Sequence, residues 1–170
     1  MKVVLGLGAN LGDLRSALNV AVAYLIADPL VGRVVRSSFY QTDPVGGPEQ
    51  PEYLNAVVIV ETDTDLTPLD VAEHFLSLGQ TIESKLDRVR EVRWGPRTID
   101  IDVLAVDGLN TDEPRLTVPH PRVAERAFVL IPWMEIAPDF DIPGLGSVTA
   151  IAANLTAADR EGVRQLVSES

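Results

Sequence analysis

Cysteine is absent from this sequence of 170 residues, and lysine is nearly absent. Without thiols, the chain has no disulfide framework, no thiolate metal site and no cysteine nucleophile. It also lacks an apolar run long enough to cross a membrane. Met1-Lys2 leads into a stretch that is too short and too rich in glycine for a signal peptide. We therefore expect a cytoplasmic protein with no membrane partner.

Positive charge is scarce overall but locally concentrated. The formal net charge is −11, and only Lys2 and Lys85 of the 14 basic residues are lysines, so twelve are arginines. A protein that grips a nucleic-acid backbone is usually basic, which argues against a nucleic-acid partner. Seven of the twelve arginines lie between Arg88 and Arg126. Such a patch in an acidic protein favours a discrete anionic ligand over a polyanion.

Length and periodicity favour one domain over residues 1–170. Hydrophobic residues make up 46% of the chain, enough to bury a core. The patterns predict strands over 2–7, 31–40, 56–61 and 98–106, helices after Asp13 and from Thr67-Pro68, a short helix after Pro121, and a weakly helical tail over 147–167. This order predicts an α+β sandwich, with a mostly antiparallel sheet packed against helices.

Three glycines, at positions 6, 8 and 12, stand where the first strand leads into the first helix. Their spacing does not match the dinucleotide-binding fingerprint. We interpret the stretch G-L-G-A-N-L-G-D as a tight strand-to-helix turn, with Asp13 as the helix cap.

The most informative stretch runs from 87 to 106. Asp100 and Asp102 stand two apart on a predicted strand, so their carboxylates share one face about 6–7 Å apart. Such a pair favours a bound cation, and Mg²⁺ is the natural candidate. Four arginines suited to phosphate oxygens precede the strand: Arg88, Arg90, Arg93 and Arg97. The combination suggests transfer chemistry on a nucleoside polyphosphate, although a solvated strand face beside a basic loop fits the spacing equally well.

Other polar residues stand at positions that suit a ligand. Asn55 lies where the Gly- and Pro-rich loop over 42–51 meets a strand; its amide suits either a heterocycle edge or a strand-end cap. Gln80 and Glu83 share a helix face that precedes the arginine loop, although a solvated face is the more common explanation. His120 is held between two prolines and could donate to a phosphate.

Taken together, these blocks resemble a known family. G-P-R-T-I-D-I-D and L-T-V-P-H-P are the most specific, with G-L-G-A-N-L-G-D and S-S-F-Y-Q-T-D-P-V-G-G-P-E-Q-P-E-Y-L-N-A-V before them. The sequence resembles 6-hydroxymethyl-7,8-dihydropterin pyrophosphokinase of folate biosynthesis. The resemblance implies a ferredoxin-like α+β sandwich that acts as a monomer. It also implies transfer of pyrophosphate from ATP to the pterin hydroxymethyl group, with attack at the β-phosphorus and release of AMP.

The resemblance also implies residue roles. Asp100 and Asp102 would hold two Mg²⁺ ions, and Trp94 would seal the site. The catalytic arginines would be Arg88, Arg90 and Arg97. The pterin would contact Thr42, Pro44, Val45, Tyr53, Asn55, Trp94 and Phe128. The nucleotide would contact Gln80, Glu83, Arg90, Trp94, Arg97, Arg115, Thr117, His120 and Arg126.

The chain departs from the family pattern at a few positions. Asp43 stands where a proline is expected before Pro44, and Pro121 stands where a tyrosine is common. The loop between Arg90 and Arg97 is one residue shorter than in the best-known members of the family. Two other functions stay open from the residues alone. A nucleotidyltransferase would also use paired aspartates but would release pyrophosphate, and a binding module would hold a nucleotide without chemistry.

Overall fold

The computed structural model describes residues 1–44, 49–86 and 98–166. Its main sheet has the strand order β10-β3-β4-β1-β5, and β2 also pairs with β4. Within the described ranges, every strand pairing of this sheet is antiparallel. The strands are β1 Lys2–Ala9, β2 Arg33–Arg36, β3 Tyr40–Thr42, β4 Tyr53–Glu61, β5 Asp100–Val106 and β10 Val163–Gln165. This architecture confirms the predicted α+β fold with a mostly antiparallel sheet.

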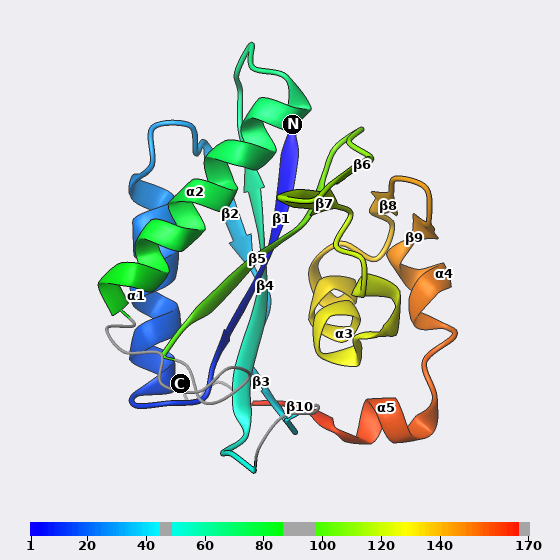
Figure 1. Cartoon of the computed structure of the whole chain (residues 1–170). Helices are drawn as coiled ribbons and strands as arrows, with labels where there is room; N and C mark the ends of the chain where they lie inside the picture. The colour runs from blue at the N-terminus through cyan, green and yellow to red at the C-terminus, as the bar shows by residue number, and fades with distance from the viewer. Residues whose placement is uncertain (45–48, 87–97, 167–170) are drawn as a thin grey trace.

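Two long helices, α1 Leu14–Ala27 and α2 Pro68–Leu86, cover one face of the sheet (Figure 1). Each begins at the cap that its sequence predicts. The Asp13 carboxylate accepts a hydrogen bond from the Ser16 amide at 3.1 Å, and the Thr67 hydroxyl accepts one from the Asp70 amide at 3.1 Å. Their buried apolar residues pack with those of the strands in one continuous core.

The helix α3 Ala127–Ile136 lies on the opposite face, next to the C-terminal elements (Figure 1). A second core forms there around the fully buried Trp133. The hairpin of β6 Thr111–Glu113 and β7 Leu116–Val118 lies beside β5, and the 3₁₀ turn η1 Val123–Glu125 leads into α3. The remaining elements are β8 Asp141–Ile142, β9 Gly146–Ser147, α4 Val148–Ala152 and α5 Ala157–Glu161.

Several predicted elements were wrong in extent. The single strand over 31–40 is two strands, because Ser37 turns toward β4: its amide donates to Val57 O and its hydroxyl accepts from the Val57 amide, both at 2.9 Å. β4 begins three residues earlier than predicted. The helix expected after Pro121 is only the turn η1. The tail expected to be helical over 147–167 contains two short helices and ends in β10, which pairs with β3.

A β-bulge decides which faces the residues of β5 occupy. Val4 pairs with Ala105 and Leu5 pairs with Val103, so Leu104 is an extra residue in β5. Val103 packs in the core under α1 and α2, whereas Leu104 packs in the core under α3. The bulge therefore lets consecutive residues of β5 contribute to both cores.

Glu135 of α3 connects this helix to the sheet. Its carboxylate accepts hydrogen bonds from the Tyr40 hydroxyl at 2.6 Å and from the Ser38 amide and hydroxyl at 2.9 and 3.1 Å. Burial raises the pKa of Tyr40, and the hydrogen bond to Glu135 and its negative charge raise it further.

The described helices include none that is long and apolar enough to span a membrane.

We expect Glu135→Gln to lower the free energy of unfolding by about 1–2 kcal/mol, because a neutral amide accepts these hydrogen bonds less strongly. The folded chain holds the Tyr40 proton more tightly than the unfolded chain, so stability should fall as the pH rises above about 10. This fall should be smaller in the variant. Urea denaturation at pH 7 and pH 10.5 measures both effects. Glu61→Gln, which removes only an exposed partner 4.0 Å from Arg33, is the matched control. Equal losses in the two variants would contradict the role of Glu135.

Candidate functional site

Two glycines in β1 leave this strand without side chains of its own along part of one face. Gly8 pairs with Asn55 on β4 and with Asp100 on β5, and Gly6 pairs with Val57 and Asp102. Directly paired residues lie on the same face of a sheet. The face is the one that α3 packs on, because Val57 belongs to the core around Trp133. The backbone of β1 at Gly6 and Gly8 thus lies between the Asn55 amide on one side and two carboxylates on the other. We call this stretch of backbone the bare floor, because β1 adds no side chain there.

Both glycines lie inside β1, which corrects their interpretation as a turn. Only Gly12 lies in the turn, with a φ of 82°. A Cβ atom on Gly8 would lie 2.5 Å from Asn55 Oδ1, which real contacts do not allow, whereas one on Gly6 would meet the flexible Leu104 side chain at 3.3 Å. The available signal was the alternation G-L-G, because two glycines two apart on a strand empty one face.

The predicted pterin residues Thr42, Tyr53 and Asn55 lie together on adjacent strands. Asn55 Nδ2 donates a hydrogen bond to Thr42 Oγ1, and both side chains are buried. This bond leaves Asn55 Oδ1 toward Gly8. Thr42 pairs directly with the half-buried Tyr53. Asn55 lies inside β4, so capping of a strand end does not explain it.

Two hydrogen bonds hold the end of the 43–52 loop against the end of β1. Asn10 Nδ2 donates to Gln50 Oε1 at 2.8 Å and to Pro51 O at 3.2 Å. Asn10 is only 3% exposed, so its amide is a buried polar group that needs these partners. The two bonds fix the approach of the chain to Tyr53. Sequence reasoning did not assign a role to either amide.

On the other side of the floor, Asp100 and Asp102 face away from the buried Ile101, as predicted from the period of a strand. Arg126 Nη1 lies 3.9 Å from Asp102 Oδ2, and its guanidinium lies 5.5 Å from the centre of the Phe128 ring. Arg126 precedes α3 directly, and the half-buried Phe128 lies in the first turn of this helix. The start of α3 therefore brings a cation and an aromatic ring to the aspartates.

His120 lies beside this group. Its amide donates to Leu104 O at 2.9 Å, and its Nδ1 accepts from the Arg122 amide at 3.1 Å. Burial lowers the pKa of His120 to about 4, and the positive charges of Arg126 and Arg122 add to the effect against the opposing Asp100. The imidazole is therefore neutral at pH 7. Because Nδ1 accepts, the proton is on Nε2, which can donate to an anion.

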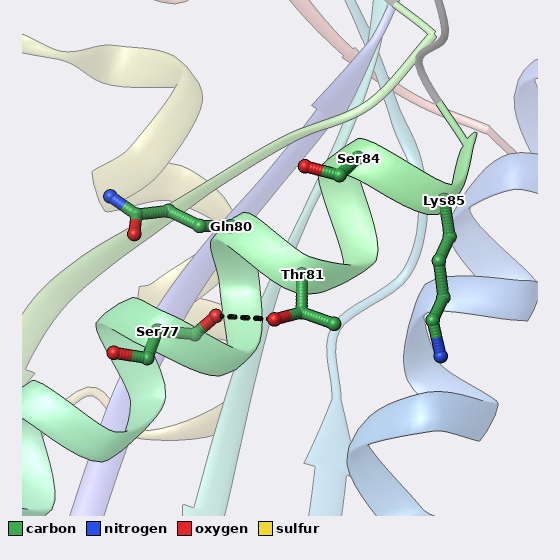
Figure 2. Close-up of a pocket in the computed structure, with 5 residues that line it drawn as sticks. All are labelled: Ser77, Gln80, Thr81, Ser84 and Lys85. Carbon is green, nitrogen blue, oxygen red and sulfur yellow. Dashed lines mark hydrogen bonds between the residues drawn. The ribbon is translucent and has the colours of Figure 1, made fainter.

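Glu83 of α2 reaches β5 at the outer edge of the described sheet. Glu83 Oε1 accepts a hydrogen bond from the Ile101 amide at 3.4 Å, which places it between the two aspartates along the strand. The helix comes this close because Gly79 faces Ile101; a Cβ there would lie 3.2 Å from Ile101 Cγ2. Figure 2 shows Gln80 on the same helix, pointing away from Lys85, at a shallow pocket lined by Ser77, Gln80, Thr81, Ser84 and Lys85.

The other predicted ligands are less closely connected. Arg115 is exposed in the turn of the β6–β7 hairpin, and Thr117 donates within the hairpin to Glu113 O at 3.2 Å. Pro44 is half-buried just after β3. Five predicted site residues lie outside the described residues: Val45, Arg88, Arg90, Trp94 and Arg97.

The donor set fits magnesium bound together with a substrate. Among the described residues, no group of three or more His, Cys, Asp or Glu side chains could hold a metal ion alone. Mg²⁺ is commonly bound through one or two carboxylates, with substrate phosphates and water as the other ligands. Asp100 and Asp102, both partly exposed on one face, match that arrangement.

A family model described as 7,8-dihydro-6-hydroxymethylpterin-pyrophosphokinase matches residues 4–138. The chain belongs to this family. The family transfers pyrophosphate from ATP to hydroxymethyldihydropterin in folate synthesis, which confirms the enzyme class predicted from the sequence.

Relatives named 2-amino-4-hydroxy-6-hydroxymethyldihydropteridine pyrophosphokinase support the assignment. The protein from Methylorubrum extorquens is 50% identical over 84% of this chain and 87% of its own length. The protein from Bacillus subtilis is 42% identical over 94% of this chain and 87% of its own length. These family relatives are similar over nearly the whole sequence, including the strands that carry the site.

Solved structures show the same fold. The Plasmodium falciparum HPPK-DHPS wild type with SDX-DHP matches 96% of this chain with a TM-score of 0.66 and 13% sequence identity. This chain spans about half, 47%, of that longer chain. The match supports the fold alone and confirms the predicted sandwich.

We expect Gly8→Ala to weaken pterin binding by about tenfold or more, because the new methyl group must displace the Asn55 side chain. Gly6→Ala is the control, since it meets only the end of Leu104. Calorimetric titration with the pterin in the absence of nucleotide measures both affinities. A similar loss in the two variants would show that the close approach of Gly8 to Asn55 is not the decisive contact.

Proposed function

We propose that the bare floor of β1 is where the pterin meets the triphosphate of ATP, and that Asp100 and Asp102 hold two Mg²⁺ ions there for in-line transfer. The observation that carries this proposal is the row Asn55–Gly8–Asp100. It sets an amide that can recognise a heterocycle across one glycine from a carboxylate that can hold a metal. Because β1 contributes no side chain here, a flat ring on the bare floor would meet the Asn55 amide, which lies against Gly8.

The amide side of the floor suits a pterin. Asn55 can exchange paired hydrogen bonds with the edge of the ring, since its amide offers both a donor and an acceptor. Thr42 holds the amide in place by accepting one hydrogen bond. Tyr53 and Phe128, both half-buried, approach from β4 and from α3 and can stack on the ring. Pro44 and Val45 complete the proposed pterin set.

The carboxylate side suits phosphate oxygens. The neutral His120 can donate a hydrogen bond from Nε2 to a phosphate oxygen. Arg126 adds a positive charge 3.9 Å from Asp102. Arginine matches phosphate geometry with its planar fork. Gln80, Glu83, Arg115 and Thr117 are the proposed contacts to the rest of the nucleotide. These groups orient the β-phosphorus toward the pterin hydroxyl, which converts the transfer into a step between positioned reactants.

When bound, two Mg²⁺ ions neutralise charge on the transferred group and on the attacking and leaving oxygens. Arg88, Arg90 and Arg97 are proposed to add positive charge, and Trp94 to exclude water over the pterin. The cytoplasmic location, the monomeric state and the single domain over 1–170 stay predictions.

A product assay tests the function. The protein is incubated with ATP, Mg²⁺ and 6-hydroxymethyl-7,8-dihydropterin, and the nucleotides are separated. We expect AMP to appear in step with the pterin diphosphate. ADP would indicate an ordinary kinase, and release of pyrophosphate would indicate a nucleotidyltransferase. The absence of any pterin-dependent product would favour a binding module.

We expect Asp102→Ala to lower kcat by about three orders of magnitude, because the variant loses a carboxylate at the point where charge develops. The fold should survive, since Asp102 is partly exposed and the buried face of β5 is unchanged. Asp112→Ala, which removes an exposed carboxylate on β6, is the control. Titration with Mn²⁺ and ATP, followed by water proton relaxation, should show weaker metal binding in Asp102→Ala only. Unchanged turnover would refute the two-metal assignment.

A further inference from the structure

The C-terminal strand β10 extends the sheet beyond β3 and brings one arginine to the open end of the β3–β4 hairpin. Arg164 Nη2 lies 3.1 Å from Asp43 Oδ1 and 3.0 Å from Glu52 Oε1. Asp43 directly follows β3, and Glu52 directly precedes β4. One guanidinium therefore bridges the two ends of the 43–52 loop, whose flanking strands carry the proposed pterin residues.

The two carboxylates need this cation. Thr42 and Tyr53 are the last directly paired residues of the hairpin, so Asp43 and Glu52 come next on opposite strands. Like charges that face each other across strands are destabilising. Each ion pair here is partly exposed and is a modest interaction by itself. A single guanidinium shared between two opposed carboxylates, however, also removes their mutual repulsion.

The backbone around Arg164 gives it a defined position. The Asp43 amide donates to Gly162 O at 3.0 Å, and the Leu166 amide donates to Phe39 O at 2.9 Å. These two bonds lie at either end of the paired residues of β10 and β3. Within that pairing, Arg164 is opposite Gln41. Leu166 also packs against the core under α1 and α2. The arginine thus belongs to a sheet strand, and it is more ordered than a long side chain on a free tail.

Arg164 lies on the opposite face of the sheet from the bare floor, because it pairs with Gln41 rather than with Thr42. Side chains alternate along a strand, so Asp43 and Glu52 point to the face opposite Thr42 and Tyr53. Glu52 lines a hollow with Arg15 and Leu54 beside α1, and Tyr53 also borders this hollow. Any effect of Arg164 on the ligand must therefore pass through the backbone of the hairpin.

We propose that Arg164 is a positioning residue for the pterin: by bridging Asp43 and Glu52 it holds the ends of β3 and β4 at the spacing that sets the Thr42–Asn55 hydrogen bond and the ring of Tyr53. This inference rests on the proposed function. It gives the C-terminal strand, which lies beyond residues 4–138 of the family match, a role in substrate affinity. It also gives Asp43 a role, at a position where the sequence departs from the expected proline.

Steady-state kinetics of Arg164→Ala tests the proposal. We expect KM for the pterin to rise about fivefold, with kcat and KM for ATP within about twofold of the wild type. KM for the pterin in Arg164→Lys should lie between the values for the wild type and Arg164→Ala, since lysine keeps the positive charge but not the planar fork of the guanidinium. Arg33→Ala, which removes an exposed arginine from an ion pair with Glu61 at the other end of β4, should match the wild type.

Charge removal supplies a rescue that a merely structural role would not predict. In the triple variant Asp43→Asn, Glu52→Gln, Arg164→Ala, the opposed carboxylates are gone, so pterin KM should return to within about twofold of the wild type. A pterin KM in Arg164→Ala equal to the wild type, an equal rise in KM for ATP, or no rescue in the triple variant would each overturn the proposal.

A second measurement does not depend on the reaction. Amide hydrogen exchange without substrate should speed up in Arg164→Ala over residues 38–43 and 52–56, but not over residues 58–61 near Arg33. Unchanged exchange at both ends of the hairpin would refute the bridge, whatever the activity. A wild-type protein that produces no AMP would instead refute the proposed function, and the exchange result would still decide the structural claim.

Discussion

The candidate site depends on the missing side chain of Gly8 in the central strand β1. This strand pairs on both sides, with β4 and with β5, and its register places Gly8 between Asn55 and Asp100. A Cβ on Gly8 would lie within 2.5 Å of Asn55 Oδ1. The same strand is otherwise buried on both faces, with Val3, Val4 and Leu5 fully covered. On the α3 face, β1 therefore lacks side chains of its own at Gly6 and Gly8, and there the side chains of Leu104 and Asn55 lie against it.

Charge is arranged differently around the site than over the whole molecule. The protein carries a formal charge of −11, yet Asp102 has a guanidinium 3.9 Å away, and burial among other positive groups lowers the pKa of His120 to about 4. A neutral imidazole donates a hydrogen bond without adding a charge, and Arg126 shares its own charge with a carboxylate. Within the described residues, the carboxylates of Asp100, Asp102 and Glu83 thus outnumber the guanidinium of Arg126 beside Asp102, which suits a ligand that brings metal ions with it.

The hairpin of β3 and β4 is held in position from three directions. Glu135 of α3 binds Ser38 and Tyr40 at the start of β3, and Asn10 holds the chain before Tyr53 from the end of β1. Arg164 bridges the ends of the loop from β10. A side chain with hydrogen bonds of this kind loses little freedom when a ligand binds, because its position is set in advance. This explains how the short strand β3 can hold the proposed pterin residue Thr42 in a fixed position.

Local signals in the sequence were enough for much of the fold. The caps at Asp13 and Thr67, the strand periodicity around Asp100 and Asp102, and the order of strands and helices all depend on neighbours in the chain, and the structure confirms them. The ends of strands and helices were harder to predict where contacts with residues far away in the sequence decide them. Ser37 interrupts the second strand because it binds Val57, and β10 forms because an edge of β3 is free to pair.

The sequence by itself determined which chemical groups are present and which faces of their own strands and helices they occupy, because periods of 2 and 3.6 residues are local properties of the backbone. Only the tertiary structure decided that Gly8 separates Asn55 from Asp100, that Arg126 reaches Asp102, and that Arg164 bridges Asp43 and Glu52. Those relations join residues more than 20 positions apart, and some of them also depend on a strand register. Register is set by the packing of whole strands, and no short stretch of sequence contains it.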